Sequence, residues 1–239
     1  MIDATGGSQV ARLQNTLQNK PLSLFVSLPA NDAGLAKAAL EEGADALKVH
    51  INVGHRASGN HFGQLDDYVE AFQKIRKLFD GPLGLVPAGS IDGISRSDWE
   101  RLAPLGFDYY SIYVHHLSSF MLNGHELDMT FAINEQYDLS LVQWARSYGF
   151  TALEASIVPG TEYGTPLSFA DVLKYRTLVE HAQLPVIIPS QRKLVAEDMQ
   201  VLRDTGVKAV MLGAIVVGHT EEQLRRAVSE FRNAIDRLT

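Results

Sequence analysis

The sequence has no cysteine, and this absence excludes several kinds of site. Disulfides, thiolate nucleophiles, and zinc or iron–sulfur centres bound by cysteine cannot form. No apolar run reaches the roughly 18 residues needed to cross a bilayer, and residues 1–20 lack the charged-then-apolar pattern of a secretory signal. We therefore expect a soluble, cytoplasmic protein that makes no contact with a membrane.

The chain also lacks an excess of positive charge. It carries 21 Lys and Arg against 28 Asp and Glu, a formal net charge of −7. This balance argues against a nucleic-acid partner. No linker rich in proline or glycine divides the 239 residues, and α/β barrels of roughly 200–250 residues form single domains. We predict one domain over residues 1–239, with residues 1–20 as a helical lead-in.

A repeated glycine signal predicts the fold. Four times a glycine ends a helix-like stretch and leads into an apolar run, at Gly43, Gly106, Gly149 and Gly206. Glycine just past a helix end adopts the left-handed conformation that terminates the helix. These and four other apolar runs predict strands beginning near residues 22, 45, 82, 108, 128, 151, 184 and 207. Strands alternating with helices indicate a parallel sheet, and eight such units favour a closed (β/α)8 TIM barrel over an open sheet.

The alternation of side chains along the strands predicts which residues face the lumen. The fourth and sixth residues after each of the four glycines are apolar and suit the side that faces the helices. The fifth, seventh and ninth residues then face inward. They include Lys48, Ser111, Glu154 and Met211 in one layer, His50, Tyr113, Ser156 and Gly213 in the next, and Asn52 and His115 at the rim. Each lumen layer of a barrel takes its four side chains from alternate strands, so Lys48 and Glu154 are predicted on opposite walls.

This polar lumen has two interpretations. Lys48 and Glu154 either form a structural ion pair that fills the barrel, or take part in chemistry. In the second case Lys48 acts as a base, a Schiff-base amine or a carboxylate anchor, and Glu154 holds or exchanges its proton. His50 and His115 are further candidates for acid–base work. Tyr113 either donates a hydrogen bond to an oxyanion or fills space.

A second group of residues predicts a phosphate site. Gly213 and Ala214 end the eighth predicted strand and begin a short helical turn, where backbone N–H groups can meet a phosphate. Ser190, Gln191 and Arg192 follow the seventh strand and offer amides, a hydroxyl and a charge. An ordinary tight turn is the alternative. Other candidate substrate ligands, by their place at strand ends or in the lumen, are Asn52, Ser111, Asn134 and Ser156.

Two glycine-bearing segments, residues 52–63 and 159–165, follow the second and sixth predicted strands. We expect both to be mobile loops at the catalytic end of the barrel. His50, His55 and His61 have no carboxylate at short spacing, so no metal site is predicted, and no cofactor motif is found. Tyr110 and His116 have the opposite parity to the lumen residues and are expected to be packing residues.

The sequence resembles the ribulose-phosphate-binding barrel superfamily. Residues 185–190 and 206–215 are similar to its last two phosphate-binding units. Residues 149–156 with 160–165 resemble the sixth unit of N-acetylmannosamine-6-phosphate 2-epimerase. The chain departs from that epimerase at Pro87 and Pro189, where the family has a catalytic lysine and glutamate. The Asp-x-Lys-x-x-Asp motif of orotidine-phosphate-type decarboxylases is also absent. The resemblance therefore implies the fold and a phosphorylated ligand, but not the reaction.

Two hypotheses about function follow. The first is an enzyme that acts on a small phosphorylated sugar or keto acid by proton transfer next to a carbonyl, as an epimerase, an isomerase or an aldolase-type lyase. The second is a non-catalytic barrel that senses a phosphorylated metabolite and regulates a partner. The sequence leaves the substrate open and allows a homo-oligomer.

Overall fold

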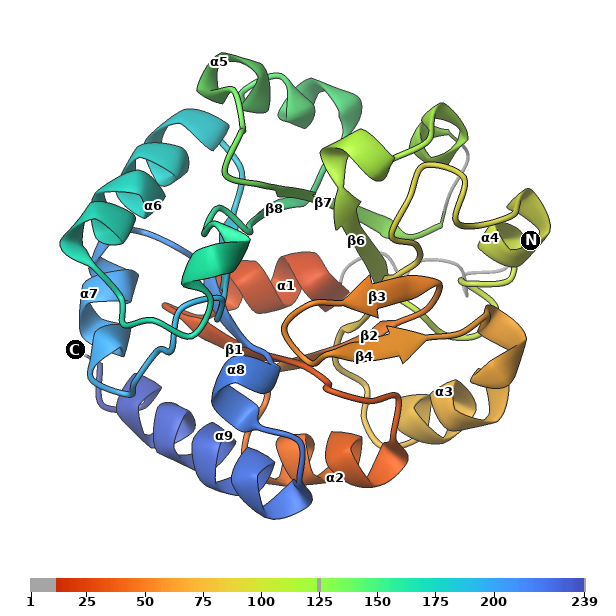
Figure 1. Cartoon of the computed structure of the whole chain (residues 1–239), viewed down its shortest axis with the longest axis horizontal. Coiled ribbons are helices and arrows are strands. Elements are labelled where there is room, and N and C mark those ends of the chain that lie inside the picture. The colour runs from red at the N-terminus through yellow and green to blue at the C-terminus, as the bar shows by residue number, and fades with distance from the viewer. Residues whose placement is uncertain (1–11, 124–125, 239) are drawn as a thin grey trace, which may run out of the picture.

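The computed structural model describes residues 12–123 and 126–238. Its main feature is a closed barrel of eight parallel strands in the order β1-β10-β9-β8-β7-β6-β5-β2 (Figure 1). The strands are β1 (Ser23–Ser27), β2 (Ala46–His50), β5 (Leu83–Val86), β6 (Tyr109–Tyr113), β7 (Asp128–Ile133), β8 (Ala152–Ala155), β9 (Val186–Pro189) and β10 (Ala209–Leu212). Each begins within two residues of the predicted position, so the (β/α)8 fold class is confirmed.

Helices follow the strands around the outside of the barrel (Figure 1). They are α2 (Ala33–Glu41), α3 (Val69–Arg76), α4 (Arg96–Glu100), α5 (Leu139–Val142), α6 (Phe169–Ala182), α7 (Asp198–Asp204), α8 (Ala214–Val217) and α9 (Glu221–Ile235). Short 3-10 turns are η1 (Leu65–Asp67), η2 (Val114–His116), η3 (Ser119–Leu122), η4 (Ala145–Tyr148) and η5 (Gly160–Glu162). No helix in the described ranges is both long and apolar enough to cross a bilayer.

Three of the four repeated glycines end helices as predicted. Gly43 follows α2, Gly149 follows η4 and Gly206 follows α7, whereas Gly106 ends a run of turns beyond α4. Gly43, Gly106, Gly149 and Gly206 have φ of 96°, 92°, 85° and 90°. This left-handed conformation costs little without a Cβ atom, so each glycine can turn the chain from the outside of the barrel into the next strand.

Helix α1 (Arg12–Asn19) closes the amino-terminal end of the barrel and lies across its centre in Figure 1. Its Leu13 and Leu17 are buried in the lumen cluster with Phe25 and Tyr109. An ion pair fixes it to the barrel, because Arg12 Nη1 lies 2.8 Å from Asp108 Oδ1. The predicted lead-in is thus helical from residue 12, while residues 1–11 lie outside the described part.

The opposite, carboxyl-terminal end carries a two-stranded hairpin. Strands β3 (Val53–His55) and β4 (Asn60–Phe62) pair antiparallel and lie in front of the barrel in Figure 1. The segment expected to be a mobile loop thus forms a hydrogen-bonded hairpin over residues 53–62, and its mobility stays a prediction. Asn52 anchors its base by donating from Nδ2 to the Pro87 carbonyl at 3.2 Å.

Candidate active site

A cavity of about 410 Å³ opens at the carboxyl-terminal end of the barrel, beneath the hairpin. Eleven of the fourteen residues selected from the sequence line it: Lys48, His50, Ser111, Tyr113, His115, Asn134, Glu154, Ser156, Ser190, Gln191 and Gly213. Three do not. Asn52 anchors the hairpin, Ala214 is buried at the start of α8, and Arg192 binds elsewhere.

A buried ion pair joins opposite walls of the cavity. Lys48 Nζ donates to Glu154 Oε1 at 2.9 Å and to Oε2 at 2.8 Å. Ser111 Oγ donates to Oε2 at 2.7 Å and Ser156 Oγ to Oε1 at 3.3 Å. Lys48 and Glu154 are only 4% and 7% exposed, yet both border the cavity. The predicted alternation therefore brings the two charges together across the lumen.

The surroundings of Glu154 favour its ionised form. Burial alone would raise the pKa of the carboxyl. The Lys48 ammonium and the hydrogen bonds from Lys48, Ser111 and Ser156 outweigh that penalty and hold the pKa below its ordinary value. The cavity therefore contains a carboxylate that can accept a proton, with a positive charge beside it.

The hairpin covers His50. Its imidazole is completely buried, stacks on Phe62 with ring centroids 4.8 Å apart and lies 4.4 Å from the ring of His55. His50 Nε2 is 3.3 Å from Ser27 Oγ, and Nδ1 has no hydrogen-bond partner among residues 12–123 and 126–238. Burial, with His55 and Lys48 nearby, lowers the pKa of His50 well below its usual range. His50 is therefore a neutral imidazole in the wall of the cavity, and its predicted acid–base role stays a prediction.

His55 of the hairpin is also neutral. Burial, with a further contribution from Lys48, lowers the pKa of His55 to about 4. Its Nδ1 lies 2.9 Å from Ser58 Oγ within the hairpin. Two uncharged imidazoles thus hold the hairpin against the barrel.

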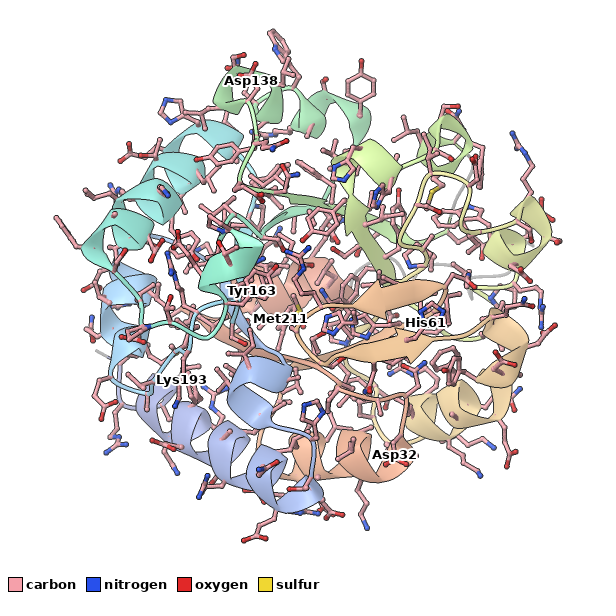
Figure 2. The ribbon with its side chains drawn as sticks, in the orientation of Figure 1. Asp32, His61, Asp138, Tyr163, Lys193 and Met211 are labelled. Atoms are coloured by element: carbon pink, nitrogen blue, oxygen red, sulfur yellow. The ribbon has the colours of Figure 1, made fainter. Side chains whose placement is uncertain are left out.

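A tyrosine pair forms another wall of the cavity. Tyr113 and Tyr163 both line it, and Tyr163 lies near the barrel axis in Figure 2, close to Met211 in that view. Burial raises the pKa of Tyr113, and Tyr163 and Glu154 raise it further. Gln191 donates to the Tyr163 hydroxyl and accepts from the Val158 N–H at 3.0 Å. Tyr113 therefore keeps its proton at neutral pH and can donate a hydrogen bond into the cavity.

The two histidines at the end of β6 lie on η2. His115 is exposed and stacks on Tyr113 with ring centroids 5.4 Å apart. His116, which was expected to be a packing residue, also borders the cavity, because the 3-10 turn breaks the strand alternation at Val114. Tyr110 is a packing residue as expected, since it is fully buried and donates to the Met121 carbonyl at 3.1 Å.

The predicted phosphate residues meet where β9 and β10 end. Ser190 Oγ accepts the Gly213 N–H at 2.7 Å, and α8 begins at Ala214. Arg192 does not join them. Its guanidinium is directed to Asp171 of α6, with Nη2 and Oδ1 3.0 Å apart, and to Glu162 at 2.6 Å. The prediction of Arg192 as a substrate ligand conflicts with this placement, because the ion pairs hold it outside the cavity lining.

Three further residues line the cavity and were not predicted from the sequence: Arg56, Glu135 and Tyr163. Arg56 lies in the turn of the hairpin, and Tyr163 follows η5. Nothing in the local sequence pattern marks either residue, because each is brought to the cavity by a loop rather than by strand alternation. Within the described ranges, no group of three His, Asp or Glu side chains could hold a metal ion.

Comparison with known proteins finds solved structures that share the fold of this chain, and no match at the level of sequence. No protein-family model matches the sequence, and no curated protein does. Tryptophan synthase from M. tuberculosis aligns over 98% of this chain and 100% of its own, with a TM-score of 0.71 and 15% identity. A mutant tryptophan synthase alpha-subunit from Pyrococcus furiosus covers 88% of this chain and 98% of its own, with a TM-score of 0.69 and 16% identity.

A third structure is thiamine phosphate pyrophosphorylase from Pyrococcus furiosus. It aligns over 91% of this chain and 96% of its own, with a TM-score of 0.62 and 18% identity. The likeness is one of fold. At these identities the TIM barrel is shared, but chemistry is a property of the site rather than of the fold. The resemblance to the epimerase stays a prediction.

Proposed function

We propose that this chain is an enzyme that moves a proton at the carbon next to a carbonyl in a small phosphorylated sugar or keto acid. The observation that carries the proposal is the Lys48–Glu154 ion pair at the base of an open cavity. An ion pair that only filled the barrel would need no access from outside, whereas this one borders a space large enough for a small metabolite.

The arrangement suits acid–base chemistry. Glu154 accepts the proton as a carboxylate, and Ser111 and Ser156 orient it. The Lys48 ammonium stabilises negative charge that develops on the substrate oxygen, and Tyr113 donates a hydrogen bond from the neighbouring wall. Imine formation is less favoured, because a lysine in an ion pair has to lose its proton before it attacks a carbonyl carbon. The geometry thus supports an epimerase or isomerase more than an aldolase-type lyase.

The end of β9 and the start of α8 supply the phosphate site of this proposal. Ser190, Gln191 and Gly213 line the cavity there, and α8 begins at Ala214 directly after them. Phosphate groups bind after the last two strands of many TIM barrels, where a short helix begins. A phosphate on this rim would leave the rest of a small substrate to extend toward Lys48 and Glu154.

Proton exchange tests the proposal directly. The chain is incubated in D2O with ribulose 5-phosphate, N-acetylmannosamine 6-phosphate and 2-keto-3-deoxy-6-phosphogluconate, and the proton next to the carbonyl is followed by NMR. We expect exchange with one of these classes, and a loss of about 10²–10⁴-fold in Glu154→Gln, the range for removing a general base.

Glu222→Gln on the exposed face of α9 is the matched control and should exchange at the rate of the unchanged chain. No exchange with any compound, or equal rates for both variants, would refute the proposed chemistry. Thermal stabilisation by one of the compounds without exchange would instead support the metabolite-sensing barrel.

A further inference from the structure

Arg56 extends from the hairpin turn across the mouth of the cavity. It lies in the turn of the β3–β4 hairpin and lines the cavity beside residues that follow β8. Its side chain reaches across to η5, where a Cβ atom on Gly160 would lie 1.5 Å from Arg56 Nη1. The absence of a side chain at position 160 is therefore what lets the guanidinium lie over this turn.

Arg56 is also an unpaired charge. Lys48, the other cation in the cavity lining, is neutralised by Glu154, and Arg192 outside it is held by Asp171. Arg56 forms no hydrogen bond or ion pair with any residue in the described ranges, the cavity residue Glu135 included. A guanidinium presents a planar set of N–H donors that fits a carboxylate or a phosphate with two parallel hydrogen bonds.

We propose that Arg56 is a second anion subsite of this cavity, and that the substrate carries, besides its phosphate, a further carboxylate or phosphate group. The inference rests on the proposed function, since it assumes that the cavity binds a phosphorylated substrate. Arg56 binds the second anionic group at the mouth of the cavity. Glu154 takes the proton from the substrate carbon, and Lys48 stabilises the charge on the substrate oxygen. Binding at Arg56 would also hold the hairpin against η5 and exclude water from the cavity.

Pairs of probes that differ by one anionic group test the subsite. Binding of 3-phosphoglycerate is compared with that of glycerol 3-phosphate, which lacks the carboxylate. Ribulose 1,5-bisphosphate is compared with ribulose 5-phosphate, which lacks the second phosphate. Affinities are measured by isothermal titration calorimetry at fixed low ionic strength, for the unchanged chain, Arg56→Ala and Arg56→Lys.

We expect the unchanged chain to prefer the doubly anionic member of at least one pair by about tenfold, the size of one charge-assisted interaction. Arg56→Ala should remove that preference while leaving the singly anionic probe unaffected, and Arg56→Lys should keep part of it. Arg226→Ala is the matched control, because Arg226 lies in a separate outer groove between α8 and α9. A preference within the 3-phosphoglycerate pair would identify the second group as a carboxylate, and a preference within the ribulose pair would identify it as a phosphate.

The proposal would be overturned by equal affinities within both pairs, by no binding of either doubly anionic probe, or by a preference that survives in Arg56→Ala. Gly160→Ala adds a geometric check, because the new methyl group must displace the guanidinium and should also reduce the preference. An affinity pattern as expected, together with no proton exchange, would keep the subsite and refute the proposed function.

A different observation concerns the outer surface. Five large apolar side chains are exposed on α5, on η4, in the turn between them, and on α6: Leu141, Tyr148, Trp144, Phe169 and Leu173. Leu141, Trp144 and Tyr148 lie within one short stretch of the chain, and Phe169 and Leu173, four residues apart, share a face of α6. Helices α5 and α6 contact each other and lie side by side in Figure 1. We call these five residues the outer patch.

We infer that the outer patch is the interface of a dimer of two copies of this chain. Its members are 52–73% exposed. With about 150–250 Å² per aromatic side chain, the patch presents roughly 500 Å² of apolar surface. That is most of the about 800 Å² per partner in a standard interface, and the polar residues around it would supply the rest. A two-fold axis through the patch lets the same residues meet in both copies, as in most homodimers.

Analytical ultracentrifugation of the whole chain at 1–100 µM tests this inference. We expect a dimer, and monomers for Trp144→Arg and Phe169→Arg, which place a charge in each of the two chain segments that form the patch. Leu78→Arg, at an exposed leucine after α3, is the control and should stay dimeric. A monomer at all concentrations, or a dimer that survives both patch variants, would overturn the inference. Circular dichroism verifies that each variant is folded.

Discussion

The Lys48–Glu154 pair makes a quantitative prediction about stability. The two side chains are almost fully buried, and both carboxylate oxygens already accept hydrogen bonds. Removing one partner leaves a buried charge without compensation, which costs about 3–5 kcal/mol. We therefore expect Lys48→Met alone and Glu154→Met alone each to lower the free energy of unfolding by about 3 kcal/mol or more.

The double variant Lys48→Met/Glu154→Met should be more stable than either single variant. Replacing a whole buried ion pair by apolar side chains of similar volume is often neutral or stabilising, so we expect a change of about 0–1 kcal/mol from the unchanged chain. Ser111 and Ser156 lose an acceptor, which limits the gain. The coupling energy between the two positions should then exceed about 3 kcal/mol.

Urea unfolding followed by circular dichroism measures all four chains, and proton exchange is measured on the same samples. If the two single effects simply add in the double variant, within about 0.5 kcal/mol, the pair is not coupled and the reasoning fails. If the double variant is stable but inactive, the pair is needed for chemistry and not for folding. A stable double variant that retains exchange would show that the pair only fills the barrel.

Three further predictions concern other parts of the molecule. Gly84→Ala should destabilise the chain by about 1–3 kcal/mol or more, because its Cβ would lie 2.1 Å from Tyr109 Cζ inside the lumen; a free energy of unfolding equal to that of the unchanged chain would contradict the overlap. Leu17→Ala, at the closed end, should cost about 2–5 kcal/mol in urea unfolding, and a smaller loss would show that α1 is not part of the core. Stability should fall as the pH drops from 6.5 towards 4, because burial lowers the pKa of His55 to about 4 and only the unfolded chain then takes up the proton. His55→Gln should remove up to about 3 kcal/mol of that loss, and an unchanged pH dependence in this variant would exclude the burial effect.

Local rules made the barrel predictable. A glycine after a helix and the two-residue period of a strand depend only on neighbouring residues, and together they placed the strands and the lumen residues. They also placed Lys48 and Glu154 on facing walls, although 106 positions separate them in the chain. Closure of the sheet, rather than any motif, brings the two charges together.

Contacts between distant segments account for what the sequence did not predict. Residues 53–62 are polar and glycine-bearing, and their three-residue strands are too short to produce an alternating pattern. Without that hairpin, the burial of His50 beneath Phe62 cannot be anticipated. Arg192 looked available for a phosphate because its carboxylate partner Asp171 lies on a different element. The position of Arg56 likewise depends on a residue that is distant in the sequence, because only a glycine at position 160 leaves room for its guanidinium.

The seal at the amino-terminal end has a kinetic consequence. Because Leu13 and Leu17 of α1 are buried at that end, the cavity formed by the described residues opens at the carboxyl-terminal end, past the hairpin and η5. A departing molecule and an arriving one therefore compete for one passage. Steady-state analysis of a reaction in this cavity should then give competitive inhibition by the end product, at a strength that depends on how tightly the covering segments rest on the rim.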